Sequence, residues 1–257
     1  MLVLLSCAKT MSAVSKVKVP LTTIPRFQKE AAEIALQMSQ FSVDELERLL
    51  RVNAKIAVEN YKRYQAFHAE ATPELPALLA YTGIVFKRLN PKDFSVEDFE
   101  YAQEHLRLTS FCYGLLRPLD VIRSYRLEGD VVLPELGNQT MFSYWQSRLT
   151  DVFIEDIKKA GGILCNLASD EMKSLFDWKR VEKEVHVITP EFQVWKNGKL
   201  ASIVIYIKMS RGEMTRFILK NRIENPEDLK SFSWEGFEFN ESLSDEKKFV
   251  FTNGKEI

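Results

Sequence analysis

Four arginine side chains that could bind an anion lie close together in the segment 105–128, HLRLTSFCYGLLRPLDVIRSYRLE. Before its last residue, Glu128, the segment contains one acid, Asp120. Guanidinium groups are costly to bury without partners, so acids from elsewhere or a phosphate-bearing ligand must pair with them. The segment is therefore a candidate anion site, and the alternative is a solvated loop with surface ion pairs. The residues concerned are Arg107, Arg117, Asp120, Arg123 and Arg126.

A second basic stretch runs from Lys196 to Arg222, where seven bases stand against one acid, Glu213. A solvated helix face normally mixes charges of both signs, so this bias favours an anionic partner. The bases are Lys196, Lys199, Lys208, Arg211, Arg216, Lys220 and Arg222.

The loop after the first apolar run carries polar groups that suit an anion. Leu2–Leu5 is predicted to be a central strand covered on both faces, and Ser6, Lys9 and Thr10 follow it. Ser6 and Lys9 have the S-x-x-K spacing that pairs a nucleophile with its base in some acyl-transfer enzymes, but the companion motifs are absent. Contact with phosphate is favoured over a serine nucleophile, because lysine and hydroxyl groups after a strand are common anion ligands.

A similar strand-to-helix junction follows the apolar run 163–167. Free backbone N–H groups at a helix start favour anions, but Asp170 and Glu171 stand there and argue against direct contact with phosphate. These acids either cap the helix or act at a site, where they would orient an arginine or serve as a general base.

The composition excludes several classes of protein. With 257 residues, 46% of them hydrophobic, the chain can bury one large core, and no low-complexity linker divides it. The formal net charge is −1, so binding to a polyanion must come from local asymmetry. The cysteines and histidines are scattered, which argues against a disulfide framework or a metal site, and no cofactor is expected. They are Cys7, Cys112, Cys165, His68, His105 and His186.

The N-terminal apolar run is not expected to be a targeting segment. It is too short for the apolar region of a signal peptide, and no positive residues precede it. Apolar runs elsewhere are far too short to span a bilayer. The scattered thiols fit a reducing compartment, so we expect a cytoplasmic protein without a membrane partner.

Hydrophobic periodicity and turn signals predict an α/β fold of the mixed α+β kind. We expect one compact domain over residues 1–257, with a central mixed sheet and flanking helices. The predicted strands cover 2–5, 75–81, 107–116, 163–167, 184–188, 192–196, 199–208, 234–239 and 248–252. The predicted helices cover 27–38, 42–50, 54–67, 98–106, 142–159 and 209–221.

Two short helices with a tight join are predicted within about residues 42–67, beginning at a capping box formed by Ser42 and Glu45. Such a pair could form a helix-hairpin-helix, a module that contacts the DNA backbone. The hairpin lacks its usual glycine, so two ordinary packed helices are favoured on pattern alone.

Motifs spread over essentially the whole chain share their order with one family. They are LLSCAKT at 4–10, HLR at 105–107, YGLLRPLD at 113–120, YRLE at 125–128, NLASDE at 166–171 and YIKMSRGEMTRFILKNR at 206–222. Together these motifs resemble the YaaA peroxide-stress protein family. The resemblance implies a bacterial cytoplasmic protein of the response to hydrogen peroxide that limits damage linked to intracellular iron. It also implies a single-domain α/β fold with a positively charged cleft, a helix-hairpin-helix-like element and DNA binding.

The sequence departs from the family pattern in a few places. Cys7 stands where a proline is expected, and residues 83–89 lack an acid, a tyrosine and a glycine of the pattern. Met172 replaces an aromatic residue, and Met209-Ser210 replace Lys-Ala. The basic positions are retained, which favours anion binding over a particular catalytic chemistry.

Two hypotheses from different classes follow. In the first, a basic cleft binds DNA phosphates and nearby tyrosines stack on bases. In the second, the protein is an enzyme that acts on a nucleotide-like or phosphorylated small molecule. An open groove would favour DNA, whereas a deep pocket where the loops after Leu5, Leu116 and Leu167 converge would favour the enzyme. The candidates are Lys9, Thr10, Arg107, Arg117, Arg126, Lys208, Arg211 and Arg216 for phosphate, Tyr113, Tyr125 and Tyr206 for stacking, and Ser6, Asp170 and Glu171 for catalysis.

Both hypotheses share one geometric expectation. Strand ends gather ligands in α/β sheets, so the polar residues that follow or end the predicted strands should meet around one cleft. These residues are Ser6, Lys9, Arg117, Asp170, Lys208 and Arg211.

Overall fold

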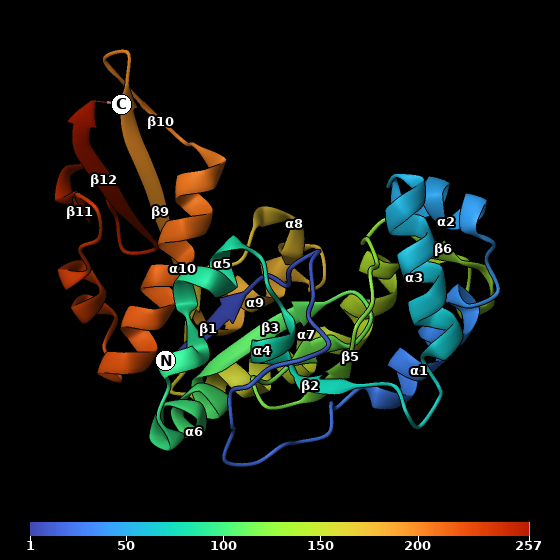
Figure 1. The fold of residues 1–257 in the computed structure, drawn as a ribbon. Helices are drawn as coiled ribbons and strands as arrows, with labels where there is room; N and C mark the ends of the chain where they lie inside the picture. Colours follow the sequence, from blue (N-terminus) through green and yellow to red (C-terminus); the bar gives the residue numbers. More distant parts are fainter. Residues whose placement is uncertain (257) are drawn as a thin grey trace.

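The structure is a computed structural model that describes residues 1–256 (Figure 1). Its central sheet has the strand order β11-β12-β9-β8-β1-β3-β4, and β10 pairs with β9. β1 (Leu2–Leu5) lies between β8 (Ile163–Asn166) and β3 (Leu106–Ser110) and is parallel to both. All four residues of β1 are buried, as expected of an apolar strand that is covered on both faces.

The outer strands make the sheet mixed. β9 (His186–Lys196) is parallel to β8, and β12 (Lys248–Glu256) is parallel to β9. In contrast, β4 (Gly114–Leu116), β10 (Lys199–Ala201) and β11 (Phe237–Phe239) are antiparallel to β3, β9 and β12. The prediction of a mixed sheet is confirmed.

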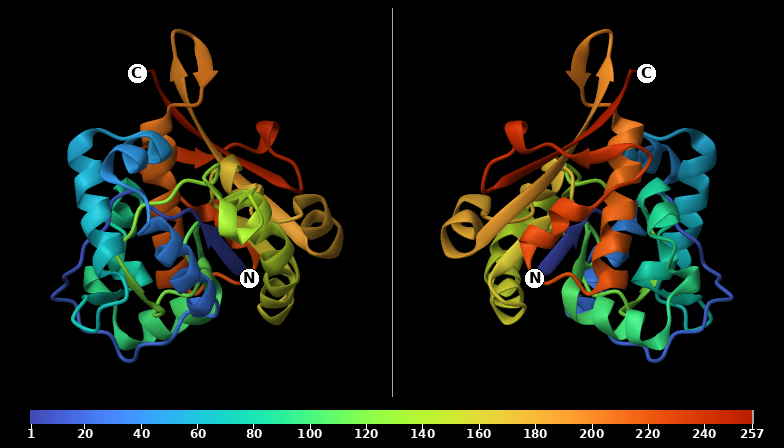
Figure 2. Two further views of the ribbon diagram at one scale, coloured as in Figure 1. Left: turned by 90° about the vertical axis from the view of Figure 1, so that its right-hand side faces the viewer. Right: turned by 90° about the vertical axis from the view of Figure 1, so that its left-hand side faces the viewer.

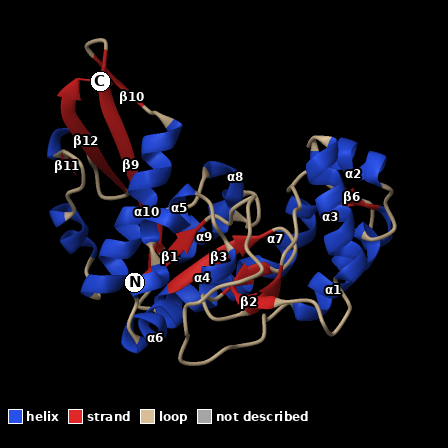
Figure 3. Ribbon diagram, in the orientation of Figure 1, coloured by secondary structure: helices blue, strands red, loops and turns tan. Residues whose placement is uncertain are grey.

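Helices cover both faces of this sheet (Figures 2 and 3). α6 (Val96–His105) packs on β1 and β3, and α10 (Val204–Asn221) packs on β9. α7 (Met141–Lys159), whose Trp145 and Phe153 are fully buried, packs on β4 and β8. Figure 2 shows α6 and α10 on one side of β1 and α7 on the other. The predicted flanking helices are therefore confirmed.

α1 (Gln28–Met38), α2 (Val43–Leu50) and α3 (Ala54–Ala66) lie at one end of the molecule (Figure 1). The predicted capping box is present at the start of α2, because the Ser42 hydroxyl accepts the Glu45 N–H while the Glu45 carboxylate accepts the Ser42 N–H.

The connection between α2 and α3 is short. It consists of Arg51, Val52 and Asn53, and Arg51 adopts the left-handed conformation, with φ of 50°. Arg51 also forms an ion pair with Asp130. A helical hairpin is therefore present, and its contact with a DNA backbone stays a prediction.

The remaining elements are short. Two further pairs of strands, β2 with β5 and β6 with β7, lie outside the central sheet. The helices of the described residues include none that is long and apolar enough to cross a membrane. These elements are α4 (Ala77–Ala80), α5 (Ile84–Leu89), α8 (Asp170–Lys173), α9 (Trp178–Glu184), β2 (Glu74–Pro76), β5 (Val121–Arg123), β6 (Val132–Leu133), β7 (Gln139–Thr140) and 3-10 turns at 91–93, 134–136, 226–231 and 241–243.

The single strand predicted over 107–116 is wrong, because this segment is the hairpin β3–β4. Ser110 accepts a hydrogen bond from the backbone N–H of Tyr113 across the turn. Gly114 then has φ of +70°, which favours glycine, and a Cβ there would lie 2.7 Å from Trp145. Gly114 therefore allows the start of β4 to lie directly against Trp145.

Two other predicted strands are helical for part of their length. In the segment 75–81 the strand β2 ends at Pro76, and Ala77–Ala80, which has high helix propensity, forms α4. In the segment 199–208 the strand β10 ends at Ala201 and α10 begins at Val204. Short apolar runs do not distinguish a strand from a buried helix by periodicity alone, which explains both errors.

Candidate functional site

A pocket of about 320 Å³ lies beside the carboxyl ends of β1 and β8. The loop after each strand contributes to it, as expected where parallel strands end. The start of α5 and the segment 125–128 complete the wall together with two side chains of α10, Lys208 and Arg211. The loops after Leu5 and Leu167 therefore converge as predicted, whereas the turn directly after Leu116 is not part of the lining.

The position of α10 at this pocket depends on a small residue. A Cβ at Gly212 would lie 2.3 Å from the carbonyl oxygen of Val85 and 2.7 Å from Arg88. Only glycine allows α5 and α10 to approach this closely. The contact places Arg211, one residue earlier on α10, against the wall that α5 provides.

The ionisable side chains of the lining carry a surplus of positive charge. Four are bases and two are acids, which gives a formal difference of +2. An enclosed surplus of this kind attracts anions, because low-dielectric walls focus the field of the charges. The bases are Lys9, Arg126, Lys208 and Arg211, and the acids are Glu128 and Glu171.

Glu128 lies between two of these bases. Lys9 donates a hydrogen bond of 2.7 Å from Nζ to Glu128 Oε2, and Arg126 Nη2 lies 3.2 Å from Glu128 Oε1. The second contact is an ion pair whose geometry does not meet that of a hydrogen bond. Glu128 Oε1 is buried, and it accepts no hydrogen bond within the described residues.

The guanidinium groups of Arg126 and Arg211 have incomplete hydrogen bonding. Their Nε atoms are buried, and neither has a hydrogen-bond partner among the residues that the structure describes. Burial lowers the pKa of Arg211, and the Asp170 carboxylate opposes this shift. Buried polar atoms are nearly always paired in folded proteins, so these two donors are exceptions, and their burial keeps them out of contact with a ligand in the pocket.

The structure brings many of the predicted site residues together at this pocket. They come from four separate parts of the chain, the loop after β1, the segment after β5, the start of α8 and the first half of α10. Lys208 is exposed, and the described acids form no ion pair with it. The predicted residues of the lining are Ser6, Lys9, Thr10, Tyr125, Arg126, Glu171, Lys208 and Arg211.

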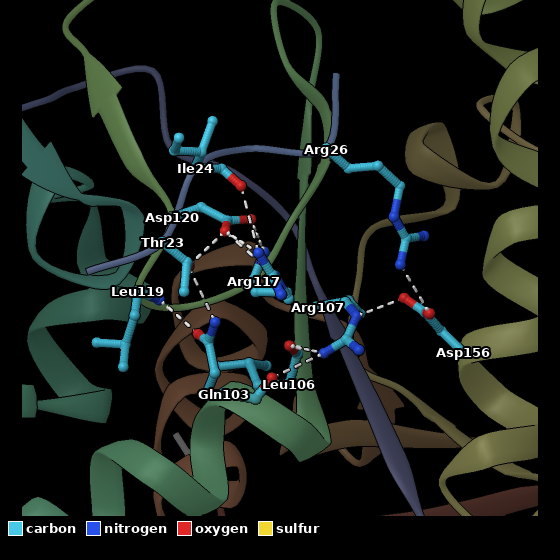
Figure 4. A network of polar contacts seen from close by, with 10 residues as sticks. All are labelled: Thr23, Ile24, Arg26, Gln103, Leu106, Arg107, Arg117, Leu119, Asp120 and Asp156. Carbon is cyan, nitrogen blue, oxygen red and sulfur yellow. Dashed lines mark hydrogen bonds and ion pairs between the residues drawn. The ribbon is translucent and has the colours of Figure 1, made fainter. Parts of the chain in front are cut away.

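Arg107 lies elsewhere, in a buried network with acids and carbonyl groups (Figure 4). Its Nε donates to Asp156 over 2.7 Å, and its Nη1 donates to the carbonyl oxygens of Gln103, Glu104 and Leu106. These carbonyls belong to the last turn of α6 and the residue after it, so Arg107 caps that helix. Asp156 balances its charge and three carbonyl groups accept from its Nη1, which removes the physical reason for a phosphate contact.

Arg117 is paired in the same way. It donates two hydrogen bonds to Asp120 Oδ1 and one to the carbonyl oxygen of Ile24 (Figure 4). The acid lies only three residues away and is almost fully buried. Arg117 is therefore not in the lining of the pocket, which corrects the expectation that it meets Lys9 and Arg211 there.

The second half of α10 is neutralised by acids from before and within α6. Arg216 forms two hydrogen bonds of 2.7 Å with Asp93, while Lys220 and Arg222 both donate to Asp98. Desolvation opposes ionisation of Asp98, but hydrogen bonds from Lys220, a backbone N–H and Arg222 outweigh it and hold its pKa at about 2. Arg216 accordingly lies outside the pocket lining.

The catalytic candidates are only partly assembled. Ser6 Oγ accepts the backbone N–H of Ser169 over 2.8 Å, and the Lys9 amine donates to Glu128 rather than to Ser6. Asp170 is exposed and paired with Lys173, whose hydrogen bond lowers the pKa of Asp170. Glu171 reaches the lining, but Asp170 does not.

Two of the three predicted stacking tyrosines lie away from the pocket lining. Tyr113 is buried, and its hydroxyl accepts the backbone N–H of Arg123, while Tyr206 packs on Phe237. Tyr125 borders the pocket, but its hydroxyl bonds with Ser110 and Tyr81 inside the core. Base stacking on an open tyrosine face therefore has no support from these positions.

The cysteines are held as buried or half-buried thiols. Burial raises the pKa of Cys7 to about 12 and raises those of Cys112 and Cys165 as well. Thiols with raised pKa values react slowly, because the thiolate is the reactive form. Cys112 lies in the turn between β3 and β4, within the segment 107–116 that was predicted to be a single strand.

The fold and the site together define a mixed α/β protein with a cation-rich pocket at the carboxyl ends of its parallel strands. The family described as peroxide stress protein YaaA matches residues 1–243 of the chain. A UPF0246 protein of Bacteroides thetaiotaomicron is 90% identical over 254 residues, with 99% of both chains covered. UPF0246 proteins of Porphyromonas gingivalis and Saccharophagus degradans are 50% and 35% identical, each with 98% of this chain and 99% of the relative covered. The chain belongs to the YaaA peroxide stress protein family.

Proposed function

We propose that this protein is a single-domain cytoplasmic member of the peroxide-stress response that binds DNA and limits iron-dependent oxidative damage. The observation that carries the DNA part is the pocket between α5, α8 and α10, whose lining holds four bases against two acids. Phosphate oxygens are strong acceptors that match guanidinium donors in geometry and charge. DNA as the source of the phosphate follows from the family resemblance.

The charge distribution around the pocket supports a ligand that extends beyond it. No acid occurs from Phe192 to Gly212, whereas Lys196, Lys199, Lys208 and Arg211 do. The β9–β10 hairpin, which carries the first two lysines, projects from the molecule on the side of α10 (Figures 1 and 2). A polyanion that contacts the hairpin and the pocket together would use all four bases.

The α2–α3 hairpin is a second element of the proposal. It rises at the opposite end of the molecule from the β9–β10 hairpin (Figure 1). We include a backbone contact of this helical hairpin with DNA because the family resemblance implies it, although Arg51 at its turn is paired with Asp130.

Salt-dependent titrations test the proposal. Lys208→Ala and Arg211→Ala should each weaken duplex binding, and each should reduce the slope of log affinity against log salt by about 0.9 if one phosphate contact is lost. Arg216→Ala is the matched control, because it removes the same charge from the same helix at a side chain held by Asp93. Absence of duplex binding at low salt, or equal effects of all three substitutions, would contradict the proposal.

A second candidate function is favoured by one observation, the size of the pocket. A volume of about 320 Å³ suits a small ligand, since such sites range from about 300 to 1,000 Å³. In this case the protein is an enzyme for a phosphorylated or nucleotide-like molecule, with the exposed Glu171 carboxylate as the available base at the lining. Salt-insensitive binding of such a molecule, with turnover lost in Glu171→Gln, would identify this function.

A further inference from the structure

The interior of the pocket is too small for duplex DNA. Its volume of about 320 Å³ lies at the lower end of the range for small-molecule sites, about 300 to 1,000 Å³. A duplex would lay its phosphates on the bases at the rim and leave the interior unfilled. The interior is therefore available to a second, smaller ligand.

Much of the lining is apolar. Ile84 and Val85, at the start of α5, line the pocket and are partly exposed to water. Phe111 and Met172 also contribute to the lining and are almost fully buried. Apolar surface gains free energy when it is removed from water, so these side chains favour a ligand that has an apolar body.

Two cations without an acidic partner lie next to this apolar surface, on α10. Lys208 is exposed and Arg211 is partly exposed, and neither side chain forms an ion pair with a described acid. They are three residues apart on the helix, so they lie on the same face and can hold one anionic group together. Gly212, the residue after Arg211, lies against Val85 of α5, so the two cations and the apolar surface are neighbours.

The other charged groups of the lining favour the α10 side for an anion. Lys9 and Arg126 already face Glu128, which balances part of their charge. Glu171 is an exposed acid and repels a second anion. A phosphate monoester carries a charge of about −1.5 to −2 at pH 7, which matches the two unpaired cations, whereas a carboxylate carries a single charge.

We propose that the pocket binds a small organic phosphate monoester, whose apolar body covers Ile84 and Val85 and whose phosphate contacts Lys208 and Arg211. The same two bases belong to the proposed DNA surface. The bound monoester and DNA therefore exclude one another, and this second part of the inference rests on the proposed function. No reaction is needed for this role, which separates it from the enzyme considered above.

The experiment is isothermal titration calorimetry of the full-length protein with phenyl phosphate, inorganic phosphate and benzoate. Phenyl phosphate should bind at least about tenfold more tightly than either of the others, because it alone combines a ring with a doubly charged group. Ile84→Ala should weaken phenyl phosphate binding about threefold or more and leave inorganic phosphate binding unchanged. Arg211→Met should weaken the binding of both phosphates about tenfold or more, as expected when a charged hydrogen-bond donor is lost.

The matched control is Arg216→Met, which should leave the binding of both phosphates unchanged because its guanidinium lies outside the pocket. Thermal unfolding establishes that each variant is folded, and Lys208→Met, at an exposed side chain, repeats the test should Arg211→Met fail to fold. The inference is overturned if phenyl phosphate binds no more tightly than inorganic phosphate, or if it binds as tightly without the α10 cation as with it. Benzoate that binds as tightly as phenyl phosphate overturns the phosphate assignment.

A displacement titration tells failure of this inference apart from failure of DNA binding. Phenyl phosphate should raise the apparent Kd of a duplex, and benzoate at the same ionic strength controls for screening. Duplex binding with a salt slope that depends on Lys208, but without binding of phenyl phosphate, leaves the proposed function intact and removes this inference. Binding of phenyl phosphate without duplex binding removes the proposed function and keeps the monoester site. Binding of both without displacement overturns the shared use of Lys208 and Arg211.

Discussion

Replacement of Arg107 by methionine should destabilise the fold and leave DNA binding unchanged. Arg107 is 8% exposed, and its Nε lies 2.7 Å from Asp156. Methionine fills much of the same volume but removes the charge and every donor. Among the described residues, the base that remains paired with Asp156 would be Arg26, at 3.2 Å and with a side chain that is 43% exposed.

The size of the effect follows from what is left unpaired. Removal of one partner of a buried ion pair costs about 3 to 5 kcal/mol, and the remaining contact with Arg26 places the expected value near about 3. Carbonyl groups at the end of α6 also lose the donors that Arg107 supplies. With a urea m-value of about 3 kcal/mol per molar, the midpoint of unfolding should fall by about 1 M.

The assay is urea unfolding followed by tryptophan fluorescence, combined with the salt titration described above. A double-mutant cycle with Asp156→Asn should give a coupling energy between about 1 and 3 kcal/mol, since the two side chains are in direct contact. Lys208→Met is the matched control, because it should change the salt slope and leave the urea midpoint unaltered. A loss of stability below about 1 kcal/mol, or a smaller salt slope in Arg107→Met, would refute the structural role of Arg107.

Three other substitutions or treatments have definite expected outcomes. The folded pKa of Asp98, about 2, lies below the unfolded value of about 3.9, so its contribution of about 3 kcal/mol is complete above about pH 5 and is lost as the pH falls towards 2. Asp98→Asn should therefore flatten the pH dependence of thermal unfolding in this range, and an unchanged profile would contradict the assignment. Gly114→Ala should cost about 3 kcal/mol, because a left-handed residue gains a Cβ that meets Trp145, and urea unfolding measures it. Dilute hydrogen peroxide should form no Cys112–Cys165 disulfide, since burial raises both pKa values, and mass spectrometry of the intact protein would detect the bond if this is wrong.

Local patterns predicted the elements that local interactions determine. The capping box of Ser42 and Glu45 needs only three residues of spacing, and α2 begins there. All four residues of β1 are apolar, so both faces of the strand favour burial, and the strand lies inside the sheet. In contrast, Val204–Ile207 is apolar and β-branched in part, yet it forms the first turn of α10, where packing outweighs strand propensity.

The pairing of charges could not be predicted, because it depends on contacts between distant parts of the chain. Arg216 and Asp93 are 123 residues apart in sequence, and Arg107 and Asp156 are 49 apart. The sequence showed that bases exceed acids in two segments, but a count within a segment does not reveal which acids fold onto it. Glu128, which closes the first segment, was recognised only as its end, although it is one of the two acids of the lining.

The basic residues of α10 therefore divide along the helix, and this division locates the ligand. Arg216, Lys220 and Arg222 in the second half are neutralised by Asp93 and Asp98 and hold α10 against α6. Lys208 and Arg211 in the first half have no ion-pair partner within 4 Å among the described acids, and both reach the pocket. Since a cation that is fully paired with protein gains little from a second anion, the positive charge available to a ligand is confined to the first half of the helix. A DNA contact that used the second half of α10 would have to break these ion pairs first. The substitutions at Lys208 and Arg211, and not the one at Arg216, therefore decide between a nucleic-acid surface and a structural charge network.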